Sequence, residues 1–386
     1  MDRPPASRMV VGCMSGTSAD GIDAAAVRIA GRGLDATHET VAFGSVPYGA
    51  HADPVRALQR GSAMTAGEIA SLSRDLGLLH AELIRGMVPQ AGQPDLIVLH
   101  GQTIHHAPPV SWQLASPAVV AAALDCDVIS DLRAADLAEG GQGAPITPLA
   151  DWLLMRDRSA APRTRVIVNL GGFCNATVLP AGAPPESSAG FDVCLCNQLL
   201  DHACLSRTGQ AFDAEGARAL RGTADAGISA RIAGQLVSQH AEGRSLGSAH
   251  ERLSLADLVA GLAPDDALAS VAEAVAQAIA QVVGAHSAKE WFAAGGGTRN
   301  AALMRALGRH AAAHGAALGM TDSIGVAAQA REAVAMAALG AAASDGAAIT
   351  LDGVTGRRTR RVIDGALTRS HRIFTIGTTL GNADCR

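Results

Sequence analysis

The sequence is short of basic charge, of paired cysteines and of apolar leader segments, and each shortage excludes a class of protein. Lysine and arginine number 31 against 36 aspartates and glutamates, a formal net charge of −5, so the basic face of a nucleic-acid-binding protein is not expected. The seven cysteines are scattered and lack the paired C-x-x-C spacing of zinc sites. The first 13 residues contain no apolar run of the length that a secretory signal needs. We therefore expect a cytoplasmic protein with reduced thiols.

Two further patterns are missing. The Ala-rich segment 327–343 is short for a membrane span and carries Arg331 and Glu332, so no membrane helix is expected there. Neither the Rossmann pattern G-x-G-x-x-G nor the P-loop pattern G-x-x-x-x-G-K-[ST] occurs, which disfavours those two nucleotide-binding folds. What is present is enough chain for two cores, because the 386 residues are 48% hydrophobic.

A strand, a glycine turn and a returning strand occur twice along the chain. Residues 10–12 lead into the turn MSGTSADG, and apolar residues return over 22–29. Residues 165–170 likewise lead into a Gly-Gly turn, and the chain returns over 175–179. This repetition predicts two α/β halves that each open on a hairpin. We place the linker near residues 134–137, which divides the chain into 1–134 and 135–386.

Other segments are expected to be regular as well. A capping box at Thr65 and Glu68 predicts a helix that continues with apolar spacing to Leu83. The apolar run 95–99 predicts a strand that delivers HGQT at its end. Further helices are expected over 116–124, 228–236, 271–282 and 300–307, and further strands over 126–129 and 291–294.

Two glycine turns have the composition of phosphate sites. The turn SGTSADG offers unshielded backbone N–H groups, hydroxyls and the carboxylate of Asp20, a set that suits a polyphosphate and its magnesium ion; an ordinary hairpin turn is an equally good interpretation of it alone. The run GGG at 295–297 permits close approach of a nucleotide, although taken alone it is better explained as a structural turn. His105 and His106 have no matching ligand cluster, so we interpret them as ordinary loop residues.

The segment GFDVCLCNQLL places Asp192 two residues before Cys194 and Cys196. It is compatible with a metal site, a redox pair or a catalytic aspartate beside an altered loop. A zinc site needs about four ligands, and no nearby pair completes one; a disulfide between residues two apart is strained. We expect both thiols to be small side chains that line the loop, so that replacing both by serine preserves the fold and the activity.

Taken together, several segments resemble one family. In chain order they are MSGTSADGID, HGQTIHH, DLR with Asp136, GGQGAP, NLGGFCNAT, GFD with Asn197, FDAEGARA, GGGTRNAALM, and Glu332 followed by VTG. They are similar to the anhydro-N-acetylmuramic acid kinases over residues 10–367. The resemblance implies the duplicated α/β fold of actin, sugar kinases and heat-shock ATPases, with ATP and Mg²⁺ in a cleft between the halves. It also implies a homodimer that phosphorylates 1,6-anhydro-N-acetylmuramic acid at O6 while water opens the anhydro ring, with no nucleic-acid or membrane partner.

The resemblance also implies roles for individual residues. Asp192 matches the family's catalytic aspartate, which makes it the expected general base, and Asp20 is the expected magnesium ligand. The expected nucleotide-binding residues are Ser15, Gly16, Thr17, Ser18, Asp20, Gly21, Gly171, Gly172, Asn175, Gly295, Gly296, Gly297 and Asn300. The expected sugar-binding residues are His100, Gln102, Thr103, Arg133 and Glu332. Two of these residues have an alternative interpretation. Arg133 could form a surface ion pair with Asp131 or Asp136, and Glu332 could be a solvated residue of a helix.

The chain departs from the family pattern in two places. Where the family has D-T-G-P-G-N, this sequence has D-V-C-L-C-N from Asp192 to Asn197, so two glycines and a hydroxyl are replaced. Where the family has K-S-T-G-R-E, residues 244–249 read RSLGSA. A second hypothesis is therefore a divergent relative that binds sugar or nucleotide with little or no kinase activity, or that acts on a different anhydro-sugar.

Overall fold

The computed structural model describes residues 7–16, 18–241 and 258–370, and within them it contains two mixed β-sheets. The first sheet has the order β12-β6-β4-β1-β2-β3, with β5 paired to β4, and the second has the order β11-β10-β7-β8-β9. The strands of the first sheet are β1 (Ser7–Ser15), β2 (Gly21–Ala30), β3 (Thr37–Pro47), β4 (Leu96–Ala107), β5 (Val110–Leu114), β6 (Val128–Ser130) and β12 (Ala366–Thr368). Those of the second are β7 (Arg165–Leu170), β8 (Phe173–Leu179), β9 (Ala189–Leu195), β10 (Glu290–Ala294) and β11 (Ala317–Met320).

The two sheets repeat one topology, which confirms the predicted duplicated α/β fold. In the first, β1, β2 and β3 form an antiparallel meander, and β4 and then β6 are added in parallel beside β1. In the second, β7, β8 and β9 form the meander, and β10 and then β11 are added in parallel beside β7. The hairpins β1–β2 and β7–β8 are the two that the glycine turns predict. The third strand of each meander, β3 and β9, is not anticipated from the sequence pattern.

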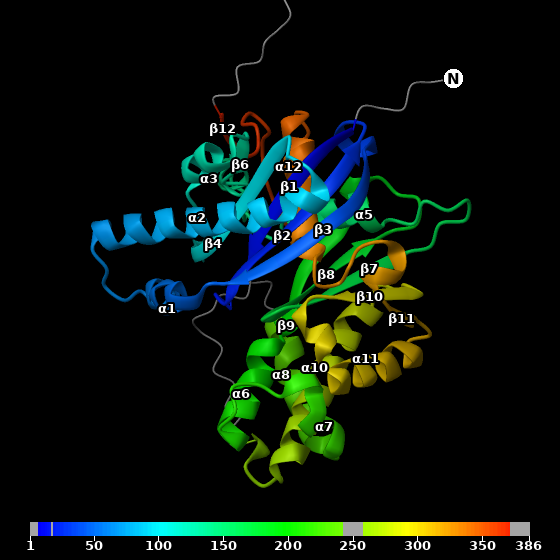
Figure 1. The fold of residues 1–386 in the computed structure, drawn as a ribbon. Helices are drawn as coiled ribbons and strands as arrows, with labels where there is room; N and C mark the ends of the chain where they lie inside the picture. The colour runs from blue at the N-terminus through cyan, green and yellow to red at the C-terminus, as the bar shows by residue number, and fades with distance from the viewer. Residues whose placement is uncertain (1–6, 17, 242–257, 371–386) are drawn as a thin grey trace, which may run out of the picture.

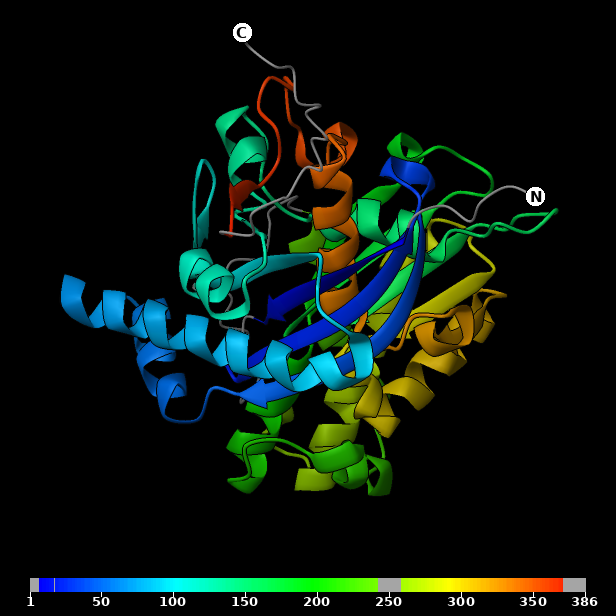
Figure 2. The same cartoon turned by 45° about the horizontal axis from the view of Figure 1, so that its top comes forward.

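Helices form three layers around and between the sheets (Figures 1 and 2). One apolar core joins the first sheet to α2 and α3, a second lies between the sheets around α5 and α12, and a third joins the second sheet to α6, α8, α10 and α11. The helices are α1 (Ala52–Gln59), α2 (Ala66–Ala91), α3 (Pro117–Leu124), α4 (Ala134–Ala138), α5 (Thr147–Met155), α6 (Asn197–Thr208), α7 (Ala217–Arg221), α8 (Ala226–Ala241), α10 (Pro264–Gly284), α11 (Ala301–Ala313), α12 (Arg331–Ser344) and α13 (Asp352–Thr355).

The alanines of α12 are explained by its position between the sheets. A Cβ atom at Gly12 would lie 2.2 Å from the carbonyl oxygen of Ala333, so α12 rests directly on the backbone of β1. Small side chains on both elements permit this approach, and almost all of α12 is buried. In the described part of the chain, α10 is the one helix long and apolar enough to span a membrane, and 78% of its most apolar window is buried inside the protein, as in a core helix.

Three local expectations are corrected. The strand predicted over 95–99 continues to Ala107, because β5 pairs with its second half in an antiparallel hairpin. His105 and His106 therefore lie in a strand rather than in a loop, and HGQT lies within β4 rather than at its end. Residues 134–137, near which the linker is expected, lie in the short helix α4. The division into 1–134 and 135–386 stays a prediction; α12 and β12 both return to the first sheet.

Candidate active site

The first glycine turn joins β1 to β2 and is held by two hydrogen bonds within the turn and one from the residue that follows β3. The Ala19 N–H donates to the carbonyl of Gly16 (3.2 Å), and the Ser18 hydroxyl donates to a carboxylate oxygen of Asp20 (3.0 Å). From the end of β3, the Tyr48 N–H donates to the carbonyl of Asp20 (2.9 Å). Thr17 lies outside the described residues. The described part of the turn thus has a defined shape with the Asp20 carboxylate at its exposed surface.

Gln102 connects this turn to β4. Its side-chain amide donates to the carbonyl of Gly16 (3.1 Å), and its amide oxygen accepts from the Tyr48 hydroxyl (2.9 Å). The contact is possible because β1 and β4 are parallel neighbours in which Ser15, the last residue of β1, lies opposite Gln102 in the middle of β4. Thr103 is the next residue along, half-buried, and its carbonyl accepts from the Gln59 side chain (3.0 Å). An expected sugar-binding residue is thereby placed against the expected phosphate turn.

His100 and Arg133 form the next part of the site. Arg133 Nε donates to His100 Nε2 (3.0 Å), so the ring proton is on Nδ1, which donates to the carbonyl of Gly101 (2.8 Å). Burial, and then the charge of Arg133, lower the pKa of His100 to about 3, so the imidazole is neutral at pH 7. The other arm of Arg133 donates to the carbonyl of Gly143 (2.5 Å). Arg133 is thus held by two neutral acceptors, instead of the alternative surface ion pair.

Arg133, Asp192 and Glu332 come together although they are far apart in the sequence. Burial lowers the pKa of Arg133 to about 10, and the charges of Asp192, Glu332 and Asp136 oppose that shift, which places all three carboxylates within electrostatic reach. Asp192 comes from β9, opposite Asn175 of β8. Two carboxylates from different elements, β9 and α12, therefore lie within electrostatic reach of the Arg133 cation.

Glu332 is fixed in the first turn of α12 and is not the solvated helix residue that was the alternative. The Asn169 side chain, at the end of β7, donates to a Glu332 carboxylate oxygen (3.2 Å). Burial raises the pKa of Glu332, and the neighbouring Arg331 opposes that effect. Arg331 is itself buried in an ion pair with Asp151 of α5, which also accepts from the Thr177 hydroxyl (2.6 Å). The backbone that carries Glu332 is consequently anchored between the sheets.

The second glycine turn faces the start of α6. The carbonyl of Gly171 accepts from the Asn197 N–H (3.0 Å), and that of Gly172 accepts from the Cys196 N–H (3.0 Å). The Asn197 side chain donates to the carbonyl of Leu170 (3.2 Å). A Cβ atom at Gly297 would lie 2.8 Å from the Asn197 amide oxygen. The second turn, the start of α6 and the GGG segment therefore meet in one place.

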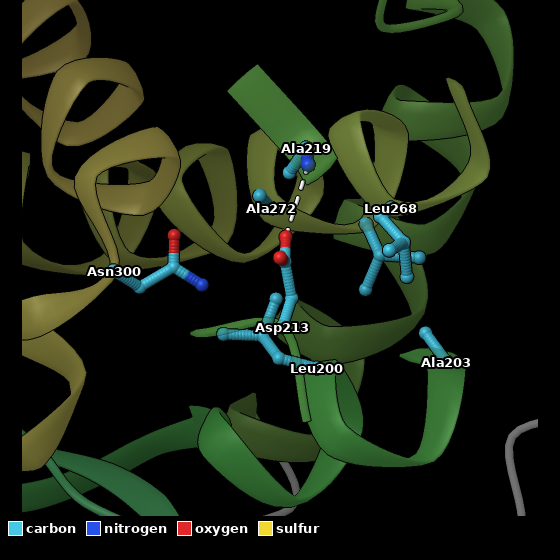
Figure 3. Close-up of a pocket in the computed structure, with 8 residues that line it drawn as sticks. Leu200, Ala203, Asp213, Ala219, Leu268, Ala272 and Asn300 are labelled. Carbon is cyan, nitrogen blue, oxygen red and sulfur yellow. Dashed lines mark hydrogen bonds between the residues drawn. The ribbon is translucent and has the colours of Figure 1, made fainter. Parts of the chain in front are cut away.

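The GGG segment passes from β10 to α11 through a short turn over Gly296–Arg299. Gly295 has φ +87°, a conformation that favours glycine. Asn300 caps α11, since its side-chain oxygen accepts from the Leu303 N–H (3.0 Å). Asn300 also borders a cavity of about 10 Å³ beside Asp213, whose carboxylate accepts from the Ala219 N–H (2.9 Å) (Figure 3). That volume holds about one water molecule, so this cavity is not a nucleotide site.

Cys194 and Cys196 do not line a phosphate loop, and this expectation was wrong. Cys194 belongs to β9, opposite Cys174 on β8, and Cys196 immediately precedes α6. All three thiols are 0% exposed in the core of the second half, and burial raises the pKa of each. Cys196 has φ −127°, so a side chain fits there without left-handed strain. Among the six described cysteines none is in a disulfide.

Two polar residues of the site, Asn169 and Asp23, were not expected from the sequence. Asn169 stands at the end of the apolar run VIVNL, where a single amide is itself a signal. Asp23 lies on β2, two residues after Gly21; burial raises its pKa, a hydrogen bond from Ser45 opposes that shift, and the charge of Asp20 adds to it. Asp23 continues the motif SGTSADGID, so its position in that turn was the available clue.

The carboxylates of Asp20 and Asp23 fit a magnesium ion. Besides the larger effect of burial, the charge of Asp20 raises the pKa of Asp23, as a nearby anion does, and a bound cation would relieve that repulsion. The described residues include no group of three or more side chains arranged to hold a metal. One or two carboxylates with water and phosphate oxygens are the usual surroundings of Mg²⁺, so the residues present suit a metal that arrives with a nucleotide.

Comparison with known proteins agrees with the sequence motifs. A family model described as Anhydro-N-acetylmuramic acid kinase matches residues 8–370. An anhydro-N-acetylmuramic acid kinase from Bordetella parapertussis is 36% identical over 376 residues, 93% of this chain and 96% of that protein. One from Gloeobacter violaceus is 34% identical over 366 residues, 90% of this chain and 95% of that protein. A solved ROK family glucokinase from Streptomyces griseus aligns at 11% identity, with a TM-score of 0.38, over 86% of this chain and 98% of that one, too distant to bear on activity. The chain belongs to the anhydro-N-acetylmuramic acid kinase family.

Proposed function

We propose that this protein uses ATP to convert 1,6-anhydro-N-acetylmuramic acid to N-acetylmuramic acid 6-phosphate. Water adds to the anomeric carbon, the bond from that carbon to O6 breaks, and O6 accepts the γ-phosphoryl group as ADP leaves. The observation that carries the proposal is the placement of Asp192 and Glu332 within electrostatic reach of Arg133, in a chain of this family. A base, a cation and an orienting carboxylate are what such a reaction requires.

Asp192 is the proposed general base. Its carboxylate takes the proton of the attacking water, so the oxygen that reaches the anomeric carbon is the better nucleophile. Arg133 supplies a fixed positive charge close by, which stabilises negative charge that develops in the reaction. Glu332, held by Asn169, orients the sugar together with His100, Gln102 and Thr103.

The two glycine turns and the GGG segment are the proposed nucleotide contacts. The residues of the first turn, Ser15 to Gly21, hold the phosphates, with Asp20 beside the magnesium ion. The residues of the second half, Gly171, Gly172, Asn175, Gly295 to Gly297 and Asn300, approach the rest of the nucleotide. Mg²⁺ supplies charge neutralisation for the phosphates when it is bound. A homodimer in the cytoplasm is part of the same proposal, on the strength of the family resemblance.

The burial of the altered segment supports an active kinase over a divergent binding protein. Val193, Cys194 and Cys196 are fully buried in the second core. The two glycines and the hydroxyl residue of the family pattern are therefore replaced at buried positions. These replacements change the packing behind Asp192 and leave the side chains that face a substrate unaltered. The other departure, at residues 244–249, lies outside the described residues.

The decisive experiment is turnover by the purified protein with ATP and a panel of sugars. Only with 1,6-anhydro-N-acetylmuramic acid do we expect both ADP release and a sugar phosphate. The mass of that product should equal the mass of the sugar plus one phosphoryl group and one water. Ordinary amino sugars serve as controls, because they have no anhydro bridge to open. Turnover with another anhydro-sugar would revise the substrate, and sugar or nucleotide binding without turnover would favour the divergent relative.

A further inference from the structure

We propose that Thr355 is a positioning residue for this reaction: with Asp136 it fixes the carbonyl of Gly143, and so the direction in which Arg133 presents its guanidinium to Asp192 and Glu332. Thr355 lies in α13, near the end of the described chain and 163 residues after Asp192. The inference rests on the proposed function, since Arg133 is one of its residues.

The chain of contacts begins at Asp136, a carboxylate that is 0% exposed. One of its oxygens accepts from the Thr355 hydroxyl (2.6 Å), and the other accepts from the Gly143 N–H (2.7 Å). Gly143 also carries the carbonyl that accepts from Arg133. The same residue therefore links Asp136 to Arg133. Removing the Thr355 hydroxyl leaves one buried carboxylate oxygen without its donor, so we expect the Asp136 side chain to move.

The loop GGQGAP is shaped around the same carboxylate. A Cβ atom at Gly141 would lie 2.1 Å from an Asp136 oxygen, and Gly143 has φ +69°. The backbone of Thr355 adds a second contact, because its carbonyl accepts from the Gln142 N–H (2.8 Å). Thr355 therefore holds this loop through both its side chain and its backbone.

A buried ion-pair network anchors the segment that carries Thr355. Arg357 pairs with Glu139 (2.7 Å), at the end of α4, and with Asp364 (2.6 Å). Glu139 also accepts from the Arg361 and Val362 N–H groups. Because this clamp exists without Thr355, loss of the Thr355 hydroxyl is expected to disturb the Asp136–Gly143 contact while the C-terminal segment stays docked.

The test compares Thr355→Val, which keeps the shape and removes the hydroxyl, with Thr355→Ser, which keeps the hydroxyl. We expect Thr355→Val to lower kcat/KM for the sugar by about 10-fold or more, as small misplacements of a catalytic group do, with the KM for ATP unchanged. Thr355→Ser should remain close to the parent. In an Arg133→Ala background, Thr355→Val should have little further effect, because Thr355 acts through Arg133.

A second measurement does not depend on turnover. Hydrogen exchange of the peptide that covers residues 136–146 should be faster in Thr355→Val than in the parent or in Thr355→Ser, while residues 357–364 stay protected. Three results would each overturn the inference. They are an unchanged exchange rate in Thr355→Val, additive effects of Thr355→Val and Arg133→Ala on kcat/KM, and an equal loss of kcat/KM in both Thr355 variants. A parent without turnover would contradict the proposed function, and the exchange result would still decide whether Thr355 holds the loop.

Discussion

At the scale of single residues, Asp192 has the most specific expected role. Asp192→Asn keeps the size of the side chain and removes the base, so we expect kcat to fall by about 10²- to 10⁴-fold. Affinity for ATP should be nearly unchanged, since a base acts mainly in the transition state. The measurement is steady-state turnover with calorimetric ATP binding. Asp53→Asn, at an exposed position of α1, is the control, and undiminished turnover in Asp192→Asn would remove this residue from the mechanism.

Cys194 allows a residue-scale prediction about stability. Because its thiol is fully buried, serine is expected to lower stability here, while the expectation that the serine variant keeps its fold stays a prediction. A serine hydroxyl would be buried among apolar side chains, so we expect Cys194→Ser to be less stable than Cys194→Ala by about 1 kcal/mol or more. Urea unfolding of both variants measures the difference. Equal stability of the two would mean that the hydroxyl finds a partner.

At the scale of elements, the first hairpin turn makes a prediction about the metal. Asp20→Ala removes the exposed carboxylate of the turn between β1 and β2, so affinity for ATP should fall when Mg²⁺ is present and change little in EDTA. Titration calorimetry under both conditions measures this. Asp53→Ala removes an equal charge from an exposed position of α1 in the same half and should bind as the parent does. The same loss of affinity with and without Mg²⁺ would exclude Asp20 as a metal ligand.

Two glycines in the turn from β10 to α11 allow an effect on packing to be distinguished from an effect on nucleotide binding. A Cβ atom at Gly297 would lie 2.7 Å from Leu170 Cβ, whereas at Gly296 the nearest heavy atom is 3.8 Å away. We expect Gly297→Ala to cost about 1–3 kcal/mol of folding free energy through overpacking. Gly296→Ala should leave the melting temperature unchanged and weaken ATP binding, because the turn is proposed to approach the nucleotide. A Gly296→Ala variant that binds ATP normally would exclude that approach.

At the scale of the whole molecule, buried histidines predict how stability depends on pH. Burial lowers the pKa of His80 to about 4, and its Nδ1 donates to the carbonyl of Leu76 (2.7 Å). Between the ordinary pKa of 6.5 and this folded value, the unfolded chain binds a proton that the folded chain does not, so stability falls as pH falls. His38, His100 and His106 are shifted in the same direction.

Urea unfolding at pH 7 and pH 5 tests this dependence. We expect a lower free energy of unfolding at pH 5, with about 2 kcal/mol from His80 alone. His80→Gln retains an amide donor without a titrating ring, so its loss between the two pH values should be smaller by that amount. The same loss in both proteins would mean that His80 does not contribute.

The sequence alone determined the two hairpins, the capping box of α2, the duplicated α/β fold and the family. These features depend on contacts between near neighbours in the chain, or on motifs that can be recognised as strings of residues. Asp192 could be singled out for the same reason.

Only the tertiary structure decided which side chains act together. Arg133, Glu332 and Asp192 come within electrostatic reach because the start of α4, the start of α12 and β9 are brought to one place by the packing of two sheets, which no local pattern encodes. The thiol of Cys194 points into the core because β9 is a strand of the second meander, whereas its sequence neighbours read as a loop. Thr355 reaches Asp136 only because the chain returns to the first half after α12, and a contact across 219 residues leaves no periodic signal in the sequence.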